Sequence, residues 1–298
     1  MSLPDLLARP HGAGFAAAWR DAVAAEFGWR RAGPFLAVPS LGGGRTLSYL
    51  PLLNYTDLDP AGAEALAREA GGEKHLVRVL APGTDAADGA PVAMRVLLAG
   101  RSAADLWSGV VAPVCRNRVR KAEKAGMRVR RGRDPATVDA FARLLAGTLA
   151  RHGAPMLPPR LLRRLASDLG AEAFVAEAAD GRPLAGLLAA PDGGLVWVPW
   201  IATDREDGGP AGDLLFWRLL EAAAADGRDL VDFGRSPFGG GTWRFKRKWG
   251  AEAVPLRLLG AEGSPYAKFA LAQRVWKMLP RPVVDRAGPF LVRYLADY

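Results

Sequence analysis

The side chains best suited to chemistry are concentrated in residues 230–250. An apolar run at 230–233 predicts a buried strand, and the residues from Gly234 to Pro237 are expected to end it. Thr242 then predicts the cap of a short helix in which cations alternate with aromatic residues. A glycine-rich loop and a helix N-terminus both present amide N–H groups, which attract anions. We therefore expect a strand-end site for an anionic ligand here.

Lys246, on the predicted helix, is the candidate catalytic residue. It could hold a phosphate or the oxyanion of a tetrahedral acyl-transfer intermediate, and a solvated lysine in a basic helix is the alternative. Arg235 either contacts the ligand or pairs with Asp232, and Trp243 either belongs to a core or stacks on the ligand. The candidate substrate-binding residues are Asp232, Arg235, Ser236, Trp243, Arg244, Asn54, Tyr55, Arg116 and Arg120.

The formal net charge of +9 is unevenly distributed along the 298 residues. Residues 116–133 hold nine basic side chains against the single acid Glu123, and residues 234–250 hold five basic side chains and no acid. A helix over 103–125 would place Arg116 and Arg120 on one side, either as a solvated face or as contacts to phosphate. Two such patches favour a localised anionic partner over diffuse binding.

Several chemistries lack their usual sequence patterns. The chain has no P-loop, dinucleotide-binding, serine-hydrolase or zinc-protease motif. One cysteine excludes an intramolecular disulfide, and three scattered histidines give no metal-ligand spacing, so we expect no metal. No apolar run approaches the length of a spanning helix, and no signal peptide is recognisable, which predicts a cytoplasmic protein.

The order strand, loop, helix, strand occurs twice and indicates two similar α/β halves. It runs through residues 46–81 and again through residues 195–233. The segment 264–298 mixes aromatic and basic residues, and it either packs on the body or rests on anionic lipid.

Three stretches carry a resemblance to a known family: RNRVRKAEKAGMRV at 116–129, ADGRPLAGLLAA at 179–190 and VDFGRSPFGGGTWRFKRKWGAEAVPL at 231–256. The chain resembles FemAB-type proteins of the GNAT acyltransferase superfamily, and the tail VWKMLPRPVVDRAGPFLVRYL is similar to the FemAB type associated with PEP-CTERM/exosortase systems. The resemblance implies an α/β (α+β) fold with tandem GNAT-like domains, each a mixed, mostly antiparallel sheet flanked by helices. The expected segments are 1–125, 126–263 with the active site, and a basic amphipathic 264–298.

The resemblance also implies a function. It is the transfer of an acyl or aminoacyl group to an amine of a cell-envelope or exopolysaccharide precursor, with Lys246 at the position of the family's charge-stabilising lysine. We therefore expect no permanently bound cofactor, with acyl-CoA or aminoacyl-tRNA as the candidate donor substrates.

Departures from the family pattern bear on the donor and on the partners. The loop 205–210 ends in Pro210, which lacks an amide donor for a pyrophosphate and makes acyl-CoA doubtful. An inserted coiled-coil arm is missing, which weakens the case for tRNA. The expected partners are an anionic donor, a nucleotide- or lipid-linked acceptor and the inner face of the cytoplasmic membrane. A non-catalytic scaffold or RNA-binding module with this fold is the alternative.

Overall fold

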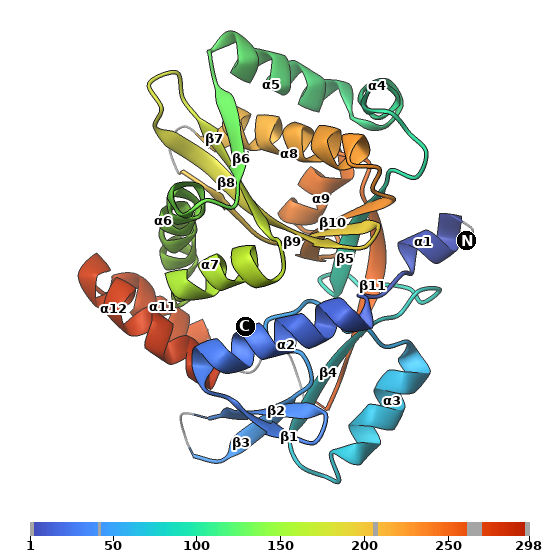
Figure 1. Cartoon of the computed structure of the whole chain (residues 1–298), viewed down its shortest axis with the longest axis vertical. Helices are drawn as coiled ribbons and strands as arrows, with labels where there is room; N and C mark the ends of the chain where they lie inside the picture. The colour runs from blue at the N-terminus through green and yellow to red at the C-terminus, as the bar shows by residue number, and fades with distance from the viewer. Residues whose placement is uncertain (1–2, 41–42, 205–207, 261–269, 296–298) are drawn as a thin grey trace.

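One continuous sheet runs through the whole protein (Figure 1). The computed structural model describes residues 3–40, 43–204, 208–260 and 270–295, and these contain eleven strands in the order β1-β2-β3-β4-β11-β5-β10-β9-β8-β7-β6. Only β3–β4 and β9–β10 pair in parallel among the described strands. The strands are β1 (Arg30–Ala32), β2 (Phe35–Pro39), β3 (Arg45–Ser48), β4 (His75–Leu80), β5 (Pro91–Leu97), β6 (Arg128–Gly132), β7 (Glu172–Glu177), β8 (Pro183–Asp192), β9 (Leu195–Thr203), β10 (Leu230–Pro237) and β11 (Glu252–Leu259).

Helices flank this sheet on both faces (Figure 1). The mixed α/β architecture with a mostly antiparallel sheet is thus as the sequence predicts. The helices are α1 (Leu3–Leu7), α2 (Ala13–Phe27), α3 (Pro60–Glu69), α4 (Ala103–Asp105), η1 (Leu106–Val110), α5 (Pro113–Lys124), α6 (Pro135–His152), α7 (Pro159–Asp168), α8 (Gly208–Ala225), α9 (Gly241–Arg247), α11 (Ala270–Met278), α12 (Arg281–Leu291) and η2 (Val292–Tyr294).

Alternation along β9 shows how the two faces are covered. Trp197 points into a core shared with α2, α6 and α7. Its neighbours Val196 and Val198 point into a second core, shared with α5 and α8. Successive side chains of a strand face opposite sides of a sheet, so the second half of the chain is a helix–sheet–helix sandwich.

The repeated strand, helix, strand order corresponds to the two parallel pairs. In the first half β3, α3 and β4 follow one another, and in the second half β9, α8 and β10 do so. β11, which the sequence pattern did not predict, inserts between β4 and β5 and hydrogen-bonds both. The halves therefore share one sheet, and the boundaries at 125 and 263 stay a prediction.

The helix expected over 103–125 is wrong as a single element. It is divided into α4, the π-helical turn η1 and α5, with Val111 and Ala112 extended between them. Pro113 takes the first position of α5 because proline has no N–H to donate and disfavours a helical residue before it.

Two expectations for residues 230–250 are also corrected. Strand β10 does not end at Gly234 but continues to Pro237, with a register shift against β5 between Asp232 and Arg235. Thr242 does not cap α9, because Gly240 occupies the N-cap position and no side chain caps the helix.

Candidate active site

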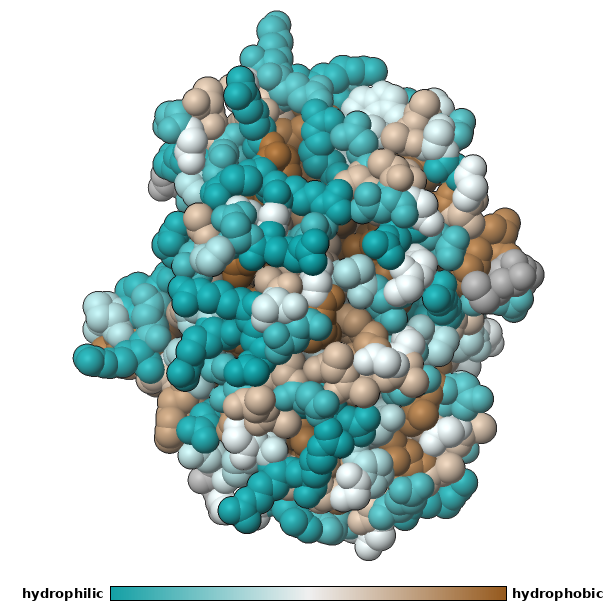
Figure 2. Space-filling view, in the orientation of Figure 1, coloured by the Kyte–Doolittle hydropathy of each residue, from teal (hydrophilic) through white to brown (hydrophobic). Residues whose placement is uncertain are grey.

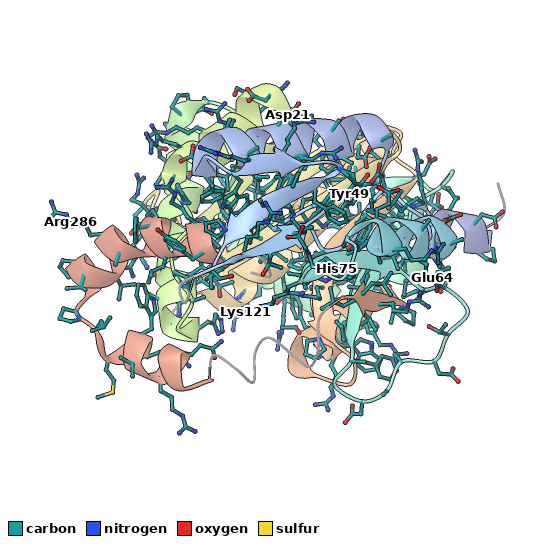
Figure 3. The ribbon with its side chains drawn as sticks, turned by 90° about the horizontal axis from the view of Figure 1, so that it is seen from below. Asp21, Tyr49, Glu64, His75, Lys121 and Arg286 are labelled. Atoms are coloured by element: carbon teal, nitrogen blue, oxygen red, sulfur yellow. The ribbon has the colours of Figure 1, made fainter. Side chains whose placement is uncertain are left out.

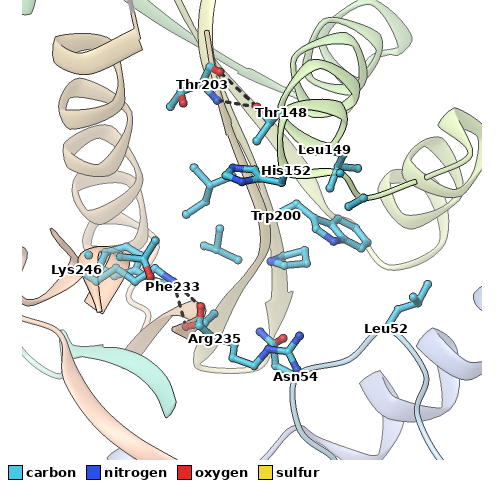
Figure 4. A pocket seen from close by; sticks show the side chains of 18 of the residues that line it. Leu52, Asn54, Thr148, Leu149, His152, Trp200, Thr203, Phe233, Arg235 and Lys246 are labelled. Atoms are coloured by element: carbon cyan, nitrogen blue, oxygen red, sulfur yellow. Dashed lines mark hydrogen bonds between the residues drawn. The ribbon is translucent and has the colours of Figure 1, made fainter. Parts of the chain in front are cut away.

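A cavity of about 720 Å³ lies beside the parallel pair β9–β10 (Figure 4). Its walls come from β9, β10, α6, α8, α9 and the C-terminal helices. Aromatic and aliphatic side chains form most of the lining, and no carboxylate lines it among the described residues. The cations that do are Arg235 and Lys246, so the cavity suits a largely apolar ligand with an anionic or electron-rich group.

The bulge in β10 determines the geometry of one wall. Gly234 has φ of +76°, and a Cβ there would lie 2.8 Å from the carbonyl oxygen of Val198. Glycine is required because an L side chain in this conformation is strained and has no room. The bulge turns the carbonyl groups of Gly234 and Arg235 toward α9.

Lys246 donates hydrogen bonds to both of these carbonyl groups. Its Nζ donates to the oxygen of Gly234 at 3.3 Å and to that of Arg235 at 3.1 Å, and the residue is 7% exposed. Burial lowers the pKa of this ammonium to about 8, while nearby Asp232 opposes the shift and Arg235 adds to it. Two of its three N–H groups are thus engaged. The third has no partner among the described residues and can serve a ligand in the cavity that Lys246 lines.

Asp232 lies behind this wall as part of a buried network. Its carboxylate accepts from Arg95 Nε at 2.9 Å and from the Tyr55 hydroxyl at 2.8 Å. A third bond comes from the backbone N–H of Gly234 at 2.6 Å. All three side chains are fully buried, and burial is the main cause of the strongly raised pKa of Tyr55. Both predicted contact residues, Asp232 and Tyr55, therefore support the bulge from behind and do not line the cavity.

Asn54 lies at the junction of the two halves and does line the cavity. Its amide oxygen is placed to accept from the indole Nε1 of Trp197 at 3.3 Å and from the backbone N–H of Arg235 at 3.2 Å. Asn54 thereby ties the loop after β3 to the bulge, close to the Arg235 side chain in Figure 4.

The other predicted contacts lie outside the lining. Ser236 is buried and its hydroxyl has no partner among the described residues. Trp243 packs on Phe238, and Arg244 is exposed on the same helix. Arg116 donates to the carbonyls of Trp107 and Ser108 in η1, and the guanidinium carbon of Arg120 lies 5.6 Å from the ring centroid of Trp107. These two arginines stabilise the turn between η1 and α5.

Sequence reasoning missed the opposite wall. His152, at the end of α6, lines the cavity with Thr148 and faces it from the side opposite Lys246 (Figure 4). Trp200 on β9 and Trp276 on α11 enclose it further. No local pattern marked them, because only the packing of α6 and α11 brings them together. Within the described part of the chain, no three His, Cys, Asp or Glu side chains are grouped as a metal would need.

Comparison with known proteins agrees with this geometry. The model of the Acetyltransferase (GNAT) domain matches residues 111–247, which include the bulge and Lys246. Residues 111–247 are thus similar to a GNAT acetyltransferase domain. The expectation of an acyltransferase enzyme is confirmed at this level, with its donor open. A comparison with curated protein sequences finds no match.

Solved structures extend the similarity to the first half. FemX superposes with a TM-score of 0.54 at 14% identity, covering 82% of this chain and 85% of that one. L-PGS from Bacillus licheniformis gives 0.54 at 13% identity, covering 91% and 99%. At such identities the likeness shows the fold alone, and it includes both halves of the sheet. None of the described helices is long and apolar enough to cross a bilayer.

Proposed function

We propose that the protein transfers an acyl or aminoacyl group to an amine of a cell-envelope or exopolysaccharide precursor, with Lys246 stabilising the transition state. The observation that carries the proposal is the buried ammonium of Lys246 on the wall of a largely apolar cavity. In such surroundings a fixed cation stabilises developing negative charge far better than it would in water.

The reaction follows from the groups present. The acceptor amine attacks the carbonyl carbon of the donor, a C–N bond forms, and the carbonyl electron pair moves onto oxygen. The free N–H of Lys246 stabilises this oxyanion. Collapse breaks the bond to the leaving group, a thiolate for acyl-CoA or a ribose hydroxyl for aminoacyl-tRNA. The amine proton passes to the leaving group through water or through His152, which lines the facing wall.

The identity of the donor and the acceptor is part of the proposal. Acyl-CoA is the donor that the matched domain class uses, whereas the FemAB resemblance favours aminoacyl-tRNA. Of the loop 205–210, residues 205–207 lie outside the described residues, and Gly208 to Pro210 begin α8. The similarity of the tail to the PEP-CTERM/exosortase-associated type favours an exopolysaccharide acceptor at the inner membrane face.

Native mass spectrometry of the purified protein with acetyl-CoA, an aminoacyl-tRNA and UDP-sugars identifies the bound donor and acceptor. With that pair, Lys246→Ala should lower kcat at least about tenfold, since a lost oxyanion contact costs roughly 2.7–4 kcal/mol. Lys248→Ala is the matched control, because Lys248 is exposed near the end of the same helix and does not line the cavity.

Wild-type turnover in Lys246→Ala would exclude this role for the lysine. If the wild type transfers none of these groups but binds RNA with a steep salt dependence, the protein is an RNA-binding module and the proposal fails.

A further inference from the structure

The C-terminal helices carry most of the exposed large apolar side chains. Five of the seven found among the described residues lie between 275 and 290. Val275 and Met278 are three residues apart on α11, Leu279 directly follows this helix, and on α12 two of the five are seven residues apart. The five are Val275 (53% exposed), Met278 (84%), Leu279 (36%), Val283 (47%) and Phe290 (54%).

The same C-terminal segment is also rich in basic residues. Residues 270–295 contain five basic side chains and one acid, Asp285, which pairs with Arg281. Arg286 projects away from the body at the end of the tail helices (Figure 3), and hydrophilic side chains cover the projecting end of α12 in Figure 2. The basic residues are Arg274, Lys277, Arg281, Arg286 and Arg293, and the guanidinium of Arg293 donates to the carbonyl oxygen of Phe27 on the body.

The inner side of the same helices is held firmly by the body. Val284 and Val292 are buried, and Trp29 Nε1 donates to the carbonyl of Arg293 at 2.9 Å. A Cβ on Gly288 would lie 2.5 Å from the backbone nitrogen of Met156, so α12 packs backbone to backbone there. The outward orientation of the apolar residues is therefore determined by the fold.

The C-terminal segment 270–295, which contains α11 and α12, also reaches the cavity. Trp276 of α11, Leu291 of α12 and Leu295 all line it. The apolar surface and the apolar wall thus belong to the same two helices.

We propose that α11–α12 docks on an anionic lipid bilayer and holds the cavity at the membrane surface. Apolar residues enter the acyl-chain boundary while cations of the same segment contact lipid headgroups, and this charge pattern selects anionic lipid over a neutral partner. Resting on the function proposed above, the acceptor is then an amphiphile that enters along the wall formed by Trp276 and Leu291.

Flotation of the full chain tests the docking without turnover. The wild type should float with vesicles of phosphatidylcholine mixed with phosphatidylglycerol and should not float with phosphatidylcholine alone. Met278→Glu with Phe290→Glu should lower the bound fraction more than about tenfold. Leu3→Glu with Val114→Glu is the matched control, because it changes charge equally at exposed apolar residues outside the tail. This control should float as the wild type does.

If both double variants lost the same fraction of vesicle binding, the added negative charge alone would explain the loss, and the proposal would be overturned. A wild type that does not float but dimerises through the tail, with dimerisation lost in the tail variant during sedimentation, would make a second copy the occupant and also overturn it. Lys246→Ala should float normally, so a failure of docking is distinguishable from a failure of the proposed chemistry.

Discussion

At the level of single residues, the ionisation of Lys246 gives the most specific prediction. Its pKa is about 8, and the proposed role needs the cation. The kcat/KM of the wild type, divided by that of Lys246→Arg at the same pH, should therefore hold constant below pH 7 and fall as pH rises through about 8, because the neutral amine cannot stabilise an oxyanion. Lys246→Arg keeps the charge at all these pH values and should lose this alkaline decline.

The same pH profile distinguishes a second role for the lysine. If kcat/KM increased through pH 8 in the wild type but not in Lys246→Arg, the neutral amine of Lys246 would be acting as a base, and oxyanion stabilisation would be wrong. A profile of Lys246→Arg identical to that of the wild type would assign the decline to a group other than Lys246.

Residue roles were only partly predictable from the sequence. The position of Lys246 after a glycine-rich strand end marked it as a candidate, and the structure places it in the cavity. Asp232 and Tyr55 were also predicted to contact the ligand. In the fold, Asp232 accepts from Arg95, which is distant in the chain, and from Tyr55, so both residues lie behind the wall. His152 carried no local signal, because α6 brings it to the cavity from elsewhere in the chain.

At the level of elements, the bulge in β10 is expected to control the position of Lys246. Gly234→Ala should lower kcat/KM at least about tenfold, because the new methyl group would displace the carbonyls that hold the ammonium. Gly227→Ala is the control, since Gly227 also has a positive φ, of +66°, but has open space around it.

The control Gly227→Ala should lower the free energy of unfolding by about 1 kcal/mol and leave kcat/KM unchanged. Steady-state kinetics and urea unfolding of both variants measure these effects. Normal kinetics in Gly234→Ala would show that the bulge does not position the lysine.

Most elements were predictable because their apolar periodicity and turn residues are local. The failures occur where distant segments decide the outcome. β10 continues past Gly234 because β5 pairs with it on the far side of the bulge, and β11 forms because β4 and β5 leave a place between them. The break before α5 is different, because Pro113 marks it locally in the sequence. The helical apolar spacing on both sides of Pro113 nevertheless favoured one continuous helix.

At the level of the whole molecule, tertiary pairing changes the meaning of the charge pattern. The sequence shows nine basic residues against one acid over 116–133. In the fold, Arg130 pairs with Glu177, and Arg131 pairs with Glu172 and Asp226. These acids lie forty or more residues away, so a count along the chain overstates the cations left for an anionic partner.

The buried pair of Arg95 and Asp232 joins the two halves of the sheet. Arg95, on β5, also donates to the carbonyls of Leu7 and Arg9, so it links the N-terminal segment to β10. Arg95→Met should lower the unfolding free energy by about 3–5 kcal/mol, because it leaves the Asp232 carboxylate buried without its cation.

Urea unfolding, followed by tryptophan fluorescence and circular dichroism, measures this loss. Arg163→Met is the control, because it breaks an exposed ion pair with Asp139 and should change stability little. Both probes should report one shared transition in the wild type, since β11 and β5 make the sheet continuous across the halves. Equal effects of the two substitutions would show that the buried pair does not hold the halves together, and separate transitions would show that the halves unfold independently.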